Sequence, residues 1–505
     1  MSQNTKITIS IAVILIFSAI LHSSISKITD ADSFYHIRHS WIYGTEGLFN
    51  SAFPWTQYSI IGKIGADIWY GFHMLILPLT LFGNLLAGIK IGAAAVTAGS
   101  LLLAFWAFRR LKVPLPLFWV FLLAFASADL LYRLTMMRPH PLSLALTLLI
   151  FSYLVTEKTK KSYLVIFLAS AAFSWIHLAL SWLPIAVLVV IAAAEWISTN
   201  RIIWQPYLLS FGGLLAGAIL RPNPFGAIKI AYIQVVQLFI EKLGSDLPLR
   251  FGKELSPFVF ENFVDQLVPI TVLIFVAAVI ALGAIKNRVV WASFALTILF
   301  FLLSFTAARR ANDIFIGFAV VFLALVFSEH SAARKKLPPL LTLAIVIVMI
   351  IMPIKNVYRF STYQVNAIDP LRFQLVGEWL QKNSQPGEIV FNIHWDRFGE
   401  LFFWNHQNYY INGMDPIFEY AYGPSYYWKT HFFAIDAAGN GYTCPQIRCT
   451  LPETVDNAKV IKKDFKASYL VVEKLRSPNI YNYFSKSPAF KKAFETERDV
   501  VFKVL

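Results

Sequence analysis

Apolar stretches separated by shorter polar ones repeat through the first two thirds of the chain. A helix needs about 20 mostly apolar residues to cross the hydrocarbon core of a bilayer. Applied along the chain, that length predicts about eleven membrane-spanning helices, centred near Leu15, Ala95, Leu122, Leu148, Ser170, Leu188, Gly213, Phe275, Thr297, Val320 and Ile345. The first has only Lys6 as a basic flank and no clear cleavage site, so we expect a retained anchor rather than a signal peptide.

The pattern changes after the last apolar stretch. A helix-like segment from Arg372 to Lys382 is followed by strand-like runs at 388–391, 467–472 and 500–502. The predicted fold class is a polytopic α-helical membrane protein with a C-terminal α+β domain, with boundaries at 1–353 and 354–505.

Basic residues in the short loops set the orientation of such a protein. With the N-terminus in the cytoplasm, the inner loops hold clusters such as Arg109–Lys112 and Lys158–Lys161, whereas the short outer loops hold few basic residues. An odd number of spans then puts the C-terminal domain outside, together with two long loops at about 27–70 and 221–267. We expect a multi-pass protein of the cell inner (plasma) membrane with an extracytoplasmic C-terminal domain.

Composition narrows the function classes. The chain of 505 residues is 57% hydrophobic and only 14% charged, against roughly 25% charged residues in soluble domains, which excludes a soluble enzyme. The net charge of +15 first suggests a nucleic-acid partner. Most of that excess falls in the predicted cytoplasmic loops, where it reports membrane orientation. We therefore expect membrane lipids as partners and no nucleic acid.

The two cysteines, Cys444 and Cys449, lie five positions apart in the predicted outer domain. An oxidising compartment allows a disulfide between them, and we expect one. The alternative is a pair of free thiols. Neither cysteine has a histidine or a basic cluster beside it in the sequence, so neither is a catalytic candidate.

Acidic and imidazole side chains recur at the predicted outer ends of the spans. Asp30 and Asp32 follow the first span with His36 close behind, His140 precedes the fourth span, and His177 ends the fifth. Such groups in one layer can bind a divalent metal or act as general acid and base. The structural alternative is that the carboxylates cap a helix and that each histidine is a satisfied interfacial residue.

Four arginines occupy the same predicted layer: Arg138, Arg221, Arg309 and Arg310. A guanidinium presents a planar fork of donors that suits phosphate oxygens, so these residues are expected to bind an anionic head group. The alternatives are contact with lipid phosphates of the outer leaflet or pairing of Arg310 with Asp313. Glu254, in the second long loop, is a candidate acid-base or positioning residue, or else a solvated surface carboxylate.

These features resemble the polyprenyl-phosphate-dependent glycosyltransferases of the GT-C fold, and within that group the bacterial relatives of the oligosaccharyltransferase catalytic subunit. The likeness rests on an odd set of spans, an outer C-terminal domain and a first outer loop that opens with Asp30-Ala31-Asp32 and continues with Phe34-Tyr35-His36-Ile37-Arg38. Two departures stand out. Arg138-Pro139-His140 stands where the family carries an acidic pair, and His394 replaces the first residue of a Trp-Trp-Asp signature. The departures favour a simpler sugar transferase over a true oligosaccharyltransferase.

The resemblance implies a donor sugar on polyprenyl phosphate or pyrophosphate and a protein, lipid or glycan acceptor. Asp30, Asp32 and Glu254 would be catalytic, and Trp395 and Asp396 would lie on the acceptor side. The donor phosphate would be bound by Arg138, Arg221, Arg309 and Arg310. A divalent Mg or Mn ion would be held by Asp32, His36, His140 and His177.

Two other function classes remain open at this stage. One is a lipid-linked sugar flippase or transporter, and the other is a non-catalytic assembly partner. Transporters place ionisable groups near the middle of broken helices, often in duplicated halves. Most spans here lack charge in the middle and no duplication is visible, so the pattern favours an enzyme.

Overall fold

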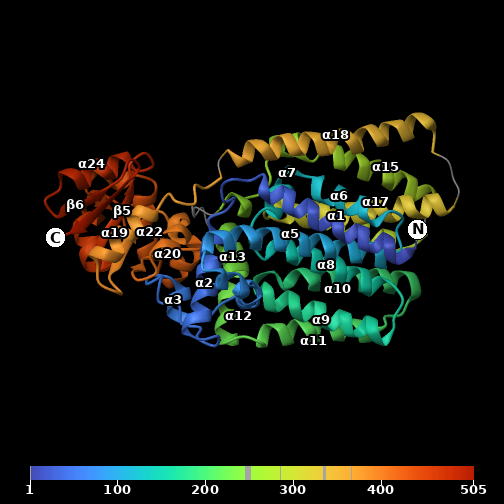
Figure 1. Cartoon of the computed structure of the whole chain (residues 1–505), viewed down its shortest axis with the longest axis horizontal. Coiled ribbons are helices and arrows are strands. Elements are labelled where there is room, and N and C mark those ends of the chain that lie inside the picture. Colours follow the sequence, from blue (N-terminus) through green and yellow to red (C-terminus); the bar gives the residue numbers. More distant parts are fainter. Residues whose placement is uncertain (1, 245–251, 285, 334–336, 366) are drawn as a thin grey trace.

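Figure 1 shows two parts of unequal size. In this computed structural model, which describes residues 2–505 except 245–251, 285, 334–336 and 366, roughly parallel helices form an elongated bundle. A smaller domain with a β-sheet lies at one end of the bundle, here called the domain end. The N-terminus lies at the opposite end of the bundle, and the C-terminus lies in the sheet domain.

Each of the eleven predicted span centres falls inside a helix. These helices are α1 (Gln3–Ser23), α5 (Leu85–Arg110), α6 (Pro116–Phe125), α8 (His140–Val155), α9 (Lys160–Ile176), α10 (Trp182–Thr199), α11 (Trp204–Ile219), α15 (Val268–Ala284), α16 (Arg288–Thr306), α17 (Ala311–Ala332) and α18 (Pro339–Gln364). α17 is buried along most of its length and forms the centre of the bundle.

Fewer helices pass a strict test for crossing a membrane. Within the described ranges, seven are long and apolar enough, or up to nine if each of two bent helix pairs counts as one span. The number is below eleven because α8, α9 and α11 have only 16, 17 and 16 residues. In addition, α6 meets α7 (Ala128–Leu134) at a bend of 101°, and α14 (Phe260–Gln266) meets α15 at a bend of 74°.

One of the seven, Pro224–Lys242, falls where the sequence predicted a long loop. It comprises α12 (Pro224–Tyr232), the π-helical turn η3 (Ile233–Gln237) and the start of α13 (Leu238–Gly244). In Figure 1, α12 and α13 run across the ends of the bundle helices rather than along them. The segment is therefore helical, and it lies between the bundle and the sheet domain.

The first loop, residues 24–84, also contains helices, all near the domain end. They are α2 (Asp32–Glu46), α3 (Ile60–Ile64), α4 (Tyr70–Ile76) and η1 (Leu77–Phe82). Two short turns elsewhere in the bundle are η2 (Leu178–Leu180) and η4 (Lys253–Leu255).

The C-terminal domain is built on a five-stranded sheet with the order β2-β1-β5-β7-β6. The strands are β1 (Ile389–Asn392), β2 (Tyr409–Tyr410), β5 (Ala467–Glu473), β6 (Phe490–Glu495) and β7 (Asp499–Val504). β1 runs parallel to β2 and β5, whereas β7 runs antiparallel to β5 and β6. Strands thus stand at all three positions where the sequence predicted them.

Helices and one small hairpin complete this domain. They are α19 (Gln374–Asn383), η5 (Trp395–Arg397), α20 (Phe398–Trp404), α21 (Pro416–Tyr422), α22 (Pro424–Ala434), η6 (Ala437–Asn440), β3 (Tyr442–Thr443), η7 (Leu451–Glu453), β4 (Val455–Asp456), α23 (Asn457–Lys459), η8 (Val460–Asp464) and α24 (Pro478–Lys486). The expected disulfide joins Cys444 to Cys449 beside the hairpin.

The first loop and the C-terminal domain share backbone hydrogen bonds and a core. The N–H of Tyr410 in β2 donates to the carbonyl of Trp55 at 2.8 Å, and the N–H of Gln57 donates back to the carbonyl of Tyr410 at 2.8 Å. Residues 55–58 therefore cover the β2 edge of the sheet. A further pair of backbone bonds joins Ile28 to Ile368.

The first loop and the C-terminal domain also pack closely beneath the start of α2. Gly399 approaches so near that a Cβ at this position would lie 2.5 Å from the carbonyl oxygen of Ala31. The rings of Tyr35, Phe53, Phe398 and Phe402 pack together between the two segments. The loop that carries Asp30 and Asp32 is thus fixed against the C-terminal domain.

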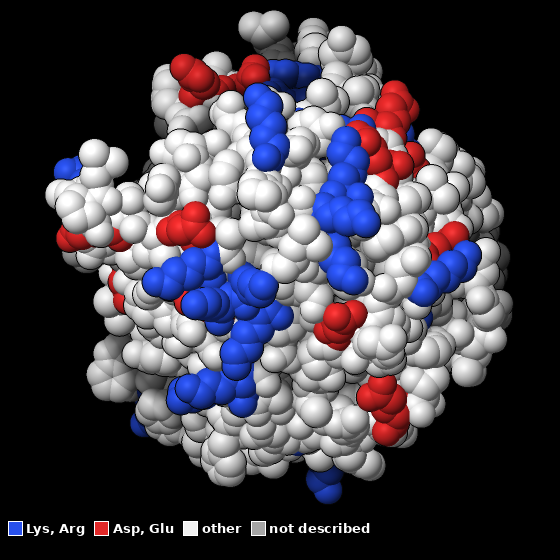
Figure 2. Space-filling model, turned by 90° about the vertical axis from the view of Figure 1, so that its left-hand side faces the viewer, with Lys and Arg blue, Asp and Glu red and all other residues white. Residues whose placement is uncertain are grey.

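The surface of the C-terminal domain carries many charges. Figure 2 views the molecule from the domain end and shows Lys and Arg side chains gathered in separate groups, with Asp and Glu side chains between them and toward the edges. Many apolar side chains on the sides of the bundle are exposed instead, among them Leu208, Phe275 and Leu282. This division matches a bundle that faces lipid and a domain that faces water.

Candidate active site

A polar cavity of about 340 Å³ lies where the domain end of the bundle meets the C-terminal domain. Its walls come from the first loop, the turn before α8, η3, η4, the start of α17 and the segment around η5. Ten residues predicted to be functional line it: Asp30, Asp32, His36, Arg138, His140, His177, Glu254, Arg310, Trp395 and Asp396. The fold therefore brings together side chains that are far apart in the sequence.

Arg138 is held by the two aspartates. Its Nε donates to Asp30 Oδ2 at 2.6 Å, and its Nη2 contacts Asp30 Oδ1 and lies 2.8 Å from Asp32 Oδ2. Asp30 Oδ2 also accepts a hydrogen bond from the backbone N–H of Ser33 at 3.2 Å. Asp30 thus caps the start of α2, which was the structural alternative, and at the same time fixes Arg138 in the cavity wall.

Glu254 and Arg310 continue the charged network. Arg310 Nη2 lies 3.1 Å from Glu254 Oε1, and that oxygen is 3.7 Å from Arg138 Nη1. The backbone holds the pair in place, because the N–H of Arg310 donates to the carbonyl of Glu254 at 2.9 Å. Asp313, the alternative partner of Arg310, pairs with Arg133 at 2.8 Å instead. Negative and positive groups therefore alternate along the wall.

These surroundings separate the pKa values of the cavity carboxyls. Withdrawal from water raises the pKa of Asp32 to about 7, with Arg138 opposing the rise and Asp30 adding to it. Burial would also raise the pKa of Glu254, but Arg310 and Arg138 outweigh it and lower the value to about 2. Asp32 can thus exchange a proton near neutral pH, and its side chain is 35% exposed, whereas Glu254 stays ionised.

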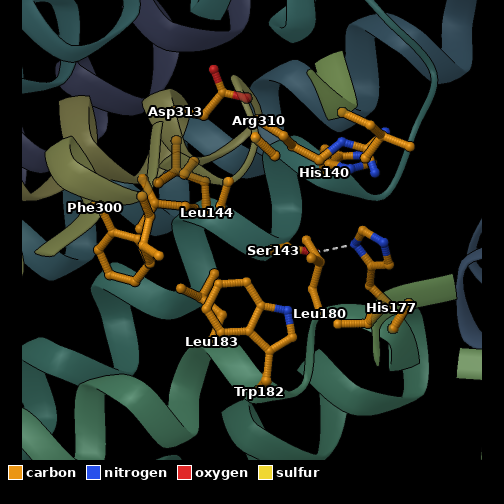
Figure 3. A pocket seen from close by; sticks show the side chains of 18 of the residues that line it. His140, Ser143, Leu144, His177, Leu180, Trp182, Leu183, Phe300, Arg310 and Asp313 are labelled. Carbon is orange, nitrogen blue, oxygen red and sulfur yellow. Dashed lines mark hydrogen bonds between the residues drawn. The ribbon is translucent and has the colours of Figure 1, made fainter. Parts of the chain in front are cut away.

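An apolar groove of about 310 Å³ adjoins the polar cavity. Figure 3 shows the rings of Trp182 and Phe300 on one side of it and the imidazoles of His140 and His177 on the other. The groove and the cavity share five lining residues: His140, His177, Gln234, Leu255 and Arg310. The two together suit a ligand with an apolar tail and a polar head.

The shared wall holds buried polar atoms that have no partner among the described residues. They are both ring nitrogens of His140, the Nε of Arg310 and the Oε1 of Gln234. Since buried polar groups are normally hydrogen-bonded, these atoms are available to a ligand. His140 is also the first residue of the 16-residue helix α8, and a helix N-terminus favours a negative charge. The junction is therefore suited to an anionic head group.

Two predicted phosphate ligands lie elsewhere. Arg221 is 6% exposed, and its hydrogen bonds to described residues all go to backbone carbonyls, including those of Asp67 at 3.1 Å and Ser174 at 2.5 Å. Arg309 pairs with Asp129 at 2.6 Å, and its guanidinium lies over the ring of Phe258. Neither arginine lines the polar cavity or the groove.

The four predicted metal ligands line the cavity, but most are engaged by the protein. Asp32 contacts Arg138, His36 Nδ1 lies 2.9 Å from His73 Nε2, and His177 Nδ1 lies 2.9 Å from the hydroxyl of Ser143. Magnesium prefers a set of oxygen ligands and retained waters, which these side chains do not supply. A Mg or Mn ion in the cavity stays a prediction.

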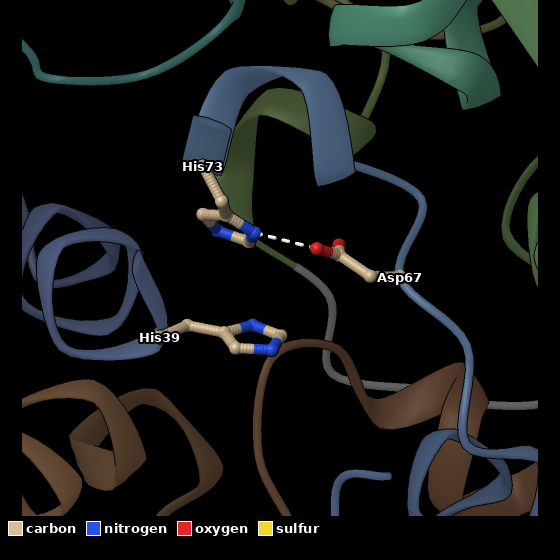
Figure 4. Close-up of side chains that lie close together, drawn as sticks. All are labelled: His39, Asp67 and His73. Atoms are coloured by element: carbon tan, nitrogen blue, oxygen red, sulfur yellow. Dashed lines mark hydrogen bonds and ion pairs between the residues drawn. The ribbon is translucent and has the colours of Figure 1, made fainter. Parts of the chain in front are cut away.

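A different group of side chains could hold a metal ion. His39, Asp67 and His73 are buried and place one ligand atom each within 4.8 Å of one another (Figure 4). Two imidazoles and one carboxylate suit a transition metal better than magnesium. The atoms are also bonded within the protein, because His73 Nδ1 lies 2.6 Å from Asp67 Oδ2 and His39 Nδ1 lies 2.8 Å from the hydroxyl of Tyr35. Hydrogen bonds alone account for this cluster.

Sequence patterns missed several residues of the cavity wall. Asp415 lines it and caps α21 by accepting from the N–H of Ile417 at 3.2 Å, and withdrawal from water raises its pKa to about 7. The Asp-Pro pair at 415–416 is a readable helix start. Its place in the cavity is not readable, because it depends on how the C-terminal domain docks on the first loop. Gln234 lies in η3, where a loop was expected.

The bundle with its docked sheet domain has the fold of solved GT-C glycosyltransferases. Particular solved structures share it. The arabinofuranosyltransferase AftD from Mycobacteria aligns with 100% of this chain at 15% identity and a TM-score of 0.54, and this chain spans only 40% of AftD. ArnT from Cupriavidus metallidurans in the apo state aligns over 99% of this chain and 98% of its own length, at 10% identity and a TM-score of 0.55.

ArnT from the same organism bound to undecaprenyl phosphate aligns over 99% of this chain and 98% of its own length, at 9% identity and a TM-score of 0.53. No protein-family model and no curated protein sequence matches the chain. The similarity therefore concerns the fold, and the chemistry must be argued from the cavity itself.

Proposed function

We propose that the protein is an integral-membrane glycosyltransferase that moves a sugar from a polyprenyl phosphate or pyrophosphate donor to an acceptor on the extracytoplasmic face of the inner membrane. The observation that carries this proposal is the junction of an apolar groove and a charged cavity, at His140, His177 and Arg310. Undecaprenyl phosphate is bound in one ArnT structure of the same fold, which supports this class of donor.

The membrane arrangement proposed with it has eleven spans, an N-terminus in the cytoplasm and the C-terminal domain outside. The N-terminus lies at the end of the bundle opposite the sheet domain, and that separation supports opposite sides of a membrane. The short helix α8 would cross where the polar cavity reaches into the bundle, because Pro139 and His140 at its start line that cavity. A cavity in the bundle end shortens the apolar path that a helix must cover.

The donor would lie with its tail in the groove and its phosphate at the junction. Trp182, Leu183 and Phe300 would contact the isoprenoid chain. The Nε of Arg310, a ring N–H of His140 and the N-terminus of α8 would hold the phosphate. These donors are in place before the reaction, so they would also stabilise the charge that develops on the departing phosphate.

The acid-base step is assigned to Asp32. An acceptor hydroxyl would form the new bond to the anomeric carbon while the bond from that carbon to the phosphate oxygen breaks. The hydroxyl proton would pass to Asp32, whose pKa of about 7 suits a base at neutral pH. Asp30 and Glu254 would position Arg138 and Arg310 by the ion pairs described above, and no step is routed through a metal ion.

Trp395 and Asp396 face the same cavity from the C-terminal domain, and we assign them to the acceptor side. His394 in place of a first Trp favours transfer of a simple sugar over transfer to an Asn-containing sequon. Protein, lipid and glycan acceptors are the three classes to compare.

The test uses the purified protein in proteoliposomes with radiolabelled polyprenyl monophosphate and diphosphate sugars and extracts that supply all three acceptor classes. We expect donor loss matched by labelled product, reduced about 10²- to 10⁴-fold by Asp32→Asn. Asp265→Asn is the matched control, because Asp265 pairs with Arg359 outside the cavity. Movement of donor between leaflets without a new glycosidic bond would refute the glycosyltransferase proposal and indicate a transporter.

A further inference from the structure

A second polar cavity, of about 610 Å³, lies in the C-terminal domain directly beside the first. The two share Gly252, Trp395 and Asp396. A molecule in the second cavity would therefore reach the charged cavity past Trp395. The volume falls in the range of small-molecule sites, roughly 300–1,000 Å³.

Hydrogen-bonding side chains form much of the wall. Glu419 Oε2 accepts from Asn412 Nδ2 at 2.7 Å and from the hydroxyl of Thr430 at 2.9 Å. At the mouth, Arg476 Nη1 lies 3.0 Å from both carboxylate oxygens of Asp396. Trp395 adds an aromatic surface. Fixed amides, carboxyls and a ring are groups that hold sugar hydroxyls and the apolar faces of sugar rings.

One buried side-chain atom of this wall has no hydrogen-bond partner among the described residues. Glu419 is 2% exposed, yet its Oε1 makes no hydrogen bond to any described residue. Withdrawal from water raises the pKa of Glu419 to about 7, so near neutral pH this oxygen can either accept or donate. A hydroxyl group, which also does both, is the matching partner.

We propose that the second cavity binds the acceptor and that the acceptor is an uncharged carbohydrate, with Glu419 Oε1 bonded to one of its hydroxyls. The inference rests on the proposed glycosyltransferase function and names its acceptor class. A neighbouring hydroxyl of the bound glycan reaches past Trp395 to Asp32. There its oxygen bonds to the anomeric carbon of the donor sugar, its proton goes to Asp32, and the polyprenyl phosphate or pyrophosphate leaves.

The charge of the wall argues against an anionic acceptor. Arg476 is the one Lys or Arg among the described lining residues, and it is paired with Asp396. Burial lowers the pKa of His394 to about 4, which leaves that imidazole neutral. Among the described lining residues a phosphorylated lipid or glycan would therefore meet no unpaired Lys or Arg, whereas phosphate sites are built from arginine and lysine.

The sheet argues against a peptide acceptor. Extended peptides often bind by adding a strand to an exposed sheet edge. The β2 edge, the one nearer the first loop, is covered by residues 55–58. The cavity therefore offers side chains rather than a free backbone edge.

The experiment measures binding without transfer, on the full-length protein in nanodiscs and without donor. Saturation-transfer NMR titrations use neutral trisaccharides of glucose, mannose or galactose, the same sugars carrying a 6-phosphate, and an Asn-containing peptide. We expect a neutral trisaccharide to bind and Glu419→Gln to weaken it about 10- to 100-fold, the effect of one hydrogen bond to an ionisable group. Trp395→Leu is a second variant that tests the same site through the shared wall.

Asp499→Asn is the matched control, because Asp499 is another buried carboxyl of this domain but lies beside Arg372, away from the cavity. It should leave trisaccharide binding unchanged. The inference is overturned if no neutral trisaccharide binds, if only phosphorylated or peptide probes bind, or if Glu419→Gln and Trp395→Leu both bind like the unmodified protein.

The two proposals fail separately. Trisaccharide binding that depends on Glu419, without any consumption of donor, would support the carbohydrate site and refute the transferase proposal. Transfer of sugar to a peptide or a phospholipid, with no trisaccharide binding, would support the transferase proposal and refute the carbohydrate site.

Discussion

Replacing Arg310 with glutamine should weaken use of the donor far more than the same change in its neighbour Arg309. Arg310 lines both the groove and the charged cavity, and its buried Nε has no partner in the described chain. A hydrogen bond to a charged group contributes about 1.5–3 kcal/mol. Loss of one such bond to the transition-state phosphate corresponds to a drop of about 10- to 160-fold in kcat/KM.

The fold should survive this change. Arg310→Gln removes one partner of Glu254, but Arg138 remains 3.7 Å from the same carboxylate oxygen. The buried charge is therefore not left alone, and only a small fall in Tm is expected. Arg309→Gln instead breaks the pair with Asp129, so it should lower Tm and leave KM for the donor unchanged.

The assay compares initial rates with a radiolabelled polyprenyl-linked sugar in proteoliposomes, together with Tm in detergent for each variant. Equal amounts of folded protein, set by gel filtration, remove differences in yield. The reasoning is refuted if Arg309→Gln loses more kcat/KM than Arg310→Gln, because the head group would then lie on the Asp129 side of the turn.

Four further results should follow. Because a base must be ionised to accept a proton, kcat/KM should rise with pH through about 7 and level off above it, and Asp32→Asn should remove this rise in a pH profile. Leu180→Trp narrows the groove and should raise KM for long-chain donors more than for short-chain ones in the transfer assay; equal changes would count against the groove. Gly399→Ala puts a Cβ 2.5 Å from the carbonyl oxygen of Ala31, so overpacking of about 1–3 kcal/mol should lower Tm, and an unchanged Tm would contradict that contact. EDTA should change the transfer rate by less than about twofold, since Asp32, His36 and His177 are already bonded within the protein and do not supply the oxygen ligands that magnesium prefers; full inactivation restored by Mg²⁺ would place an ion in the cavity.

Most helices and strands could be predicted from the sequence because each depends on a local pattern of apolar and polar residues. A long apolar run reports a buried or lipid-facing helix wherever it lies, and the runs at 467–472 and 500–502 are central strands of the sheet. Pro224–Lys242 was harder, because polar residues such as Lys229 and Gln234 interrupt its apolar positions. Its helical form depends on packing between the bundle and the sheet domain.

The sequence predicted only some of the cavity residues correctly, and two adjacent arginines show why. Arg309 and Arg310 have identical local signals, yet the turn between α16 and α17 directs one to Asp129 and the other to the cavity. Arg221 follows α11 in the layer where the sequence predicts phosphate ligands, but it bonds to carbonyls of the first loop and α9. Residue type indicates which chemistry is available, whereas the tertiary fold decides which copy of the residue is used.

The hydrogen bonds between residues 55–58 and β2 set an order for biosynthesis. Trp55 and Tyr410 are bonded neighbours in the finished protein but lie about 355 residues apart in the chain. At a synthesis rate of roughly 5–20 residues per second, the first loop emerges roughly 20 to 70 s before the strand that covers it. During that interval its unpaired backbone and the aromatic face of α2 would depend on chaperones or on the translocation machinery for protection. A nascent chain would therefore have no complete charged cavity until Asp415, the last of the described residues that line it, had been synthesised.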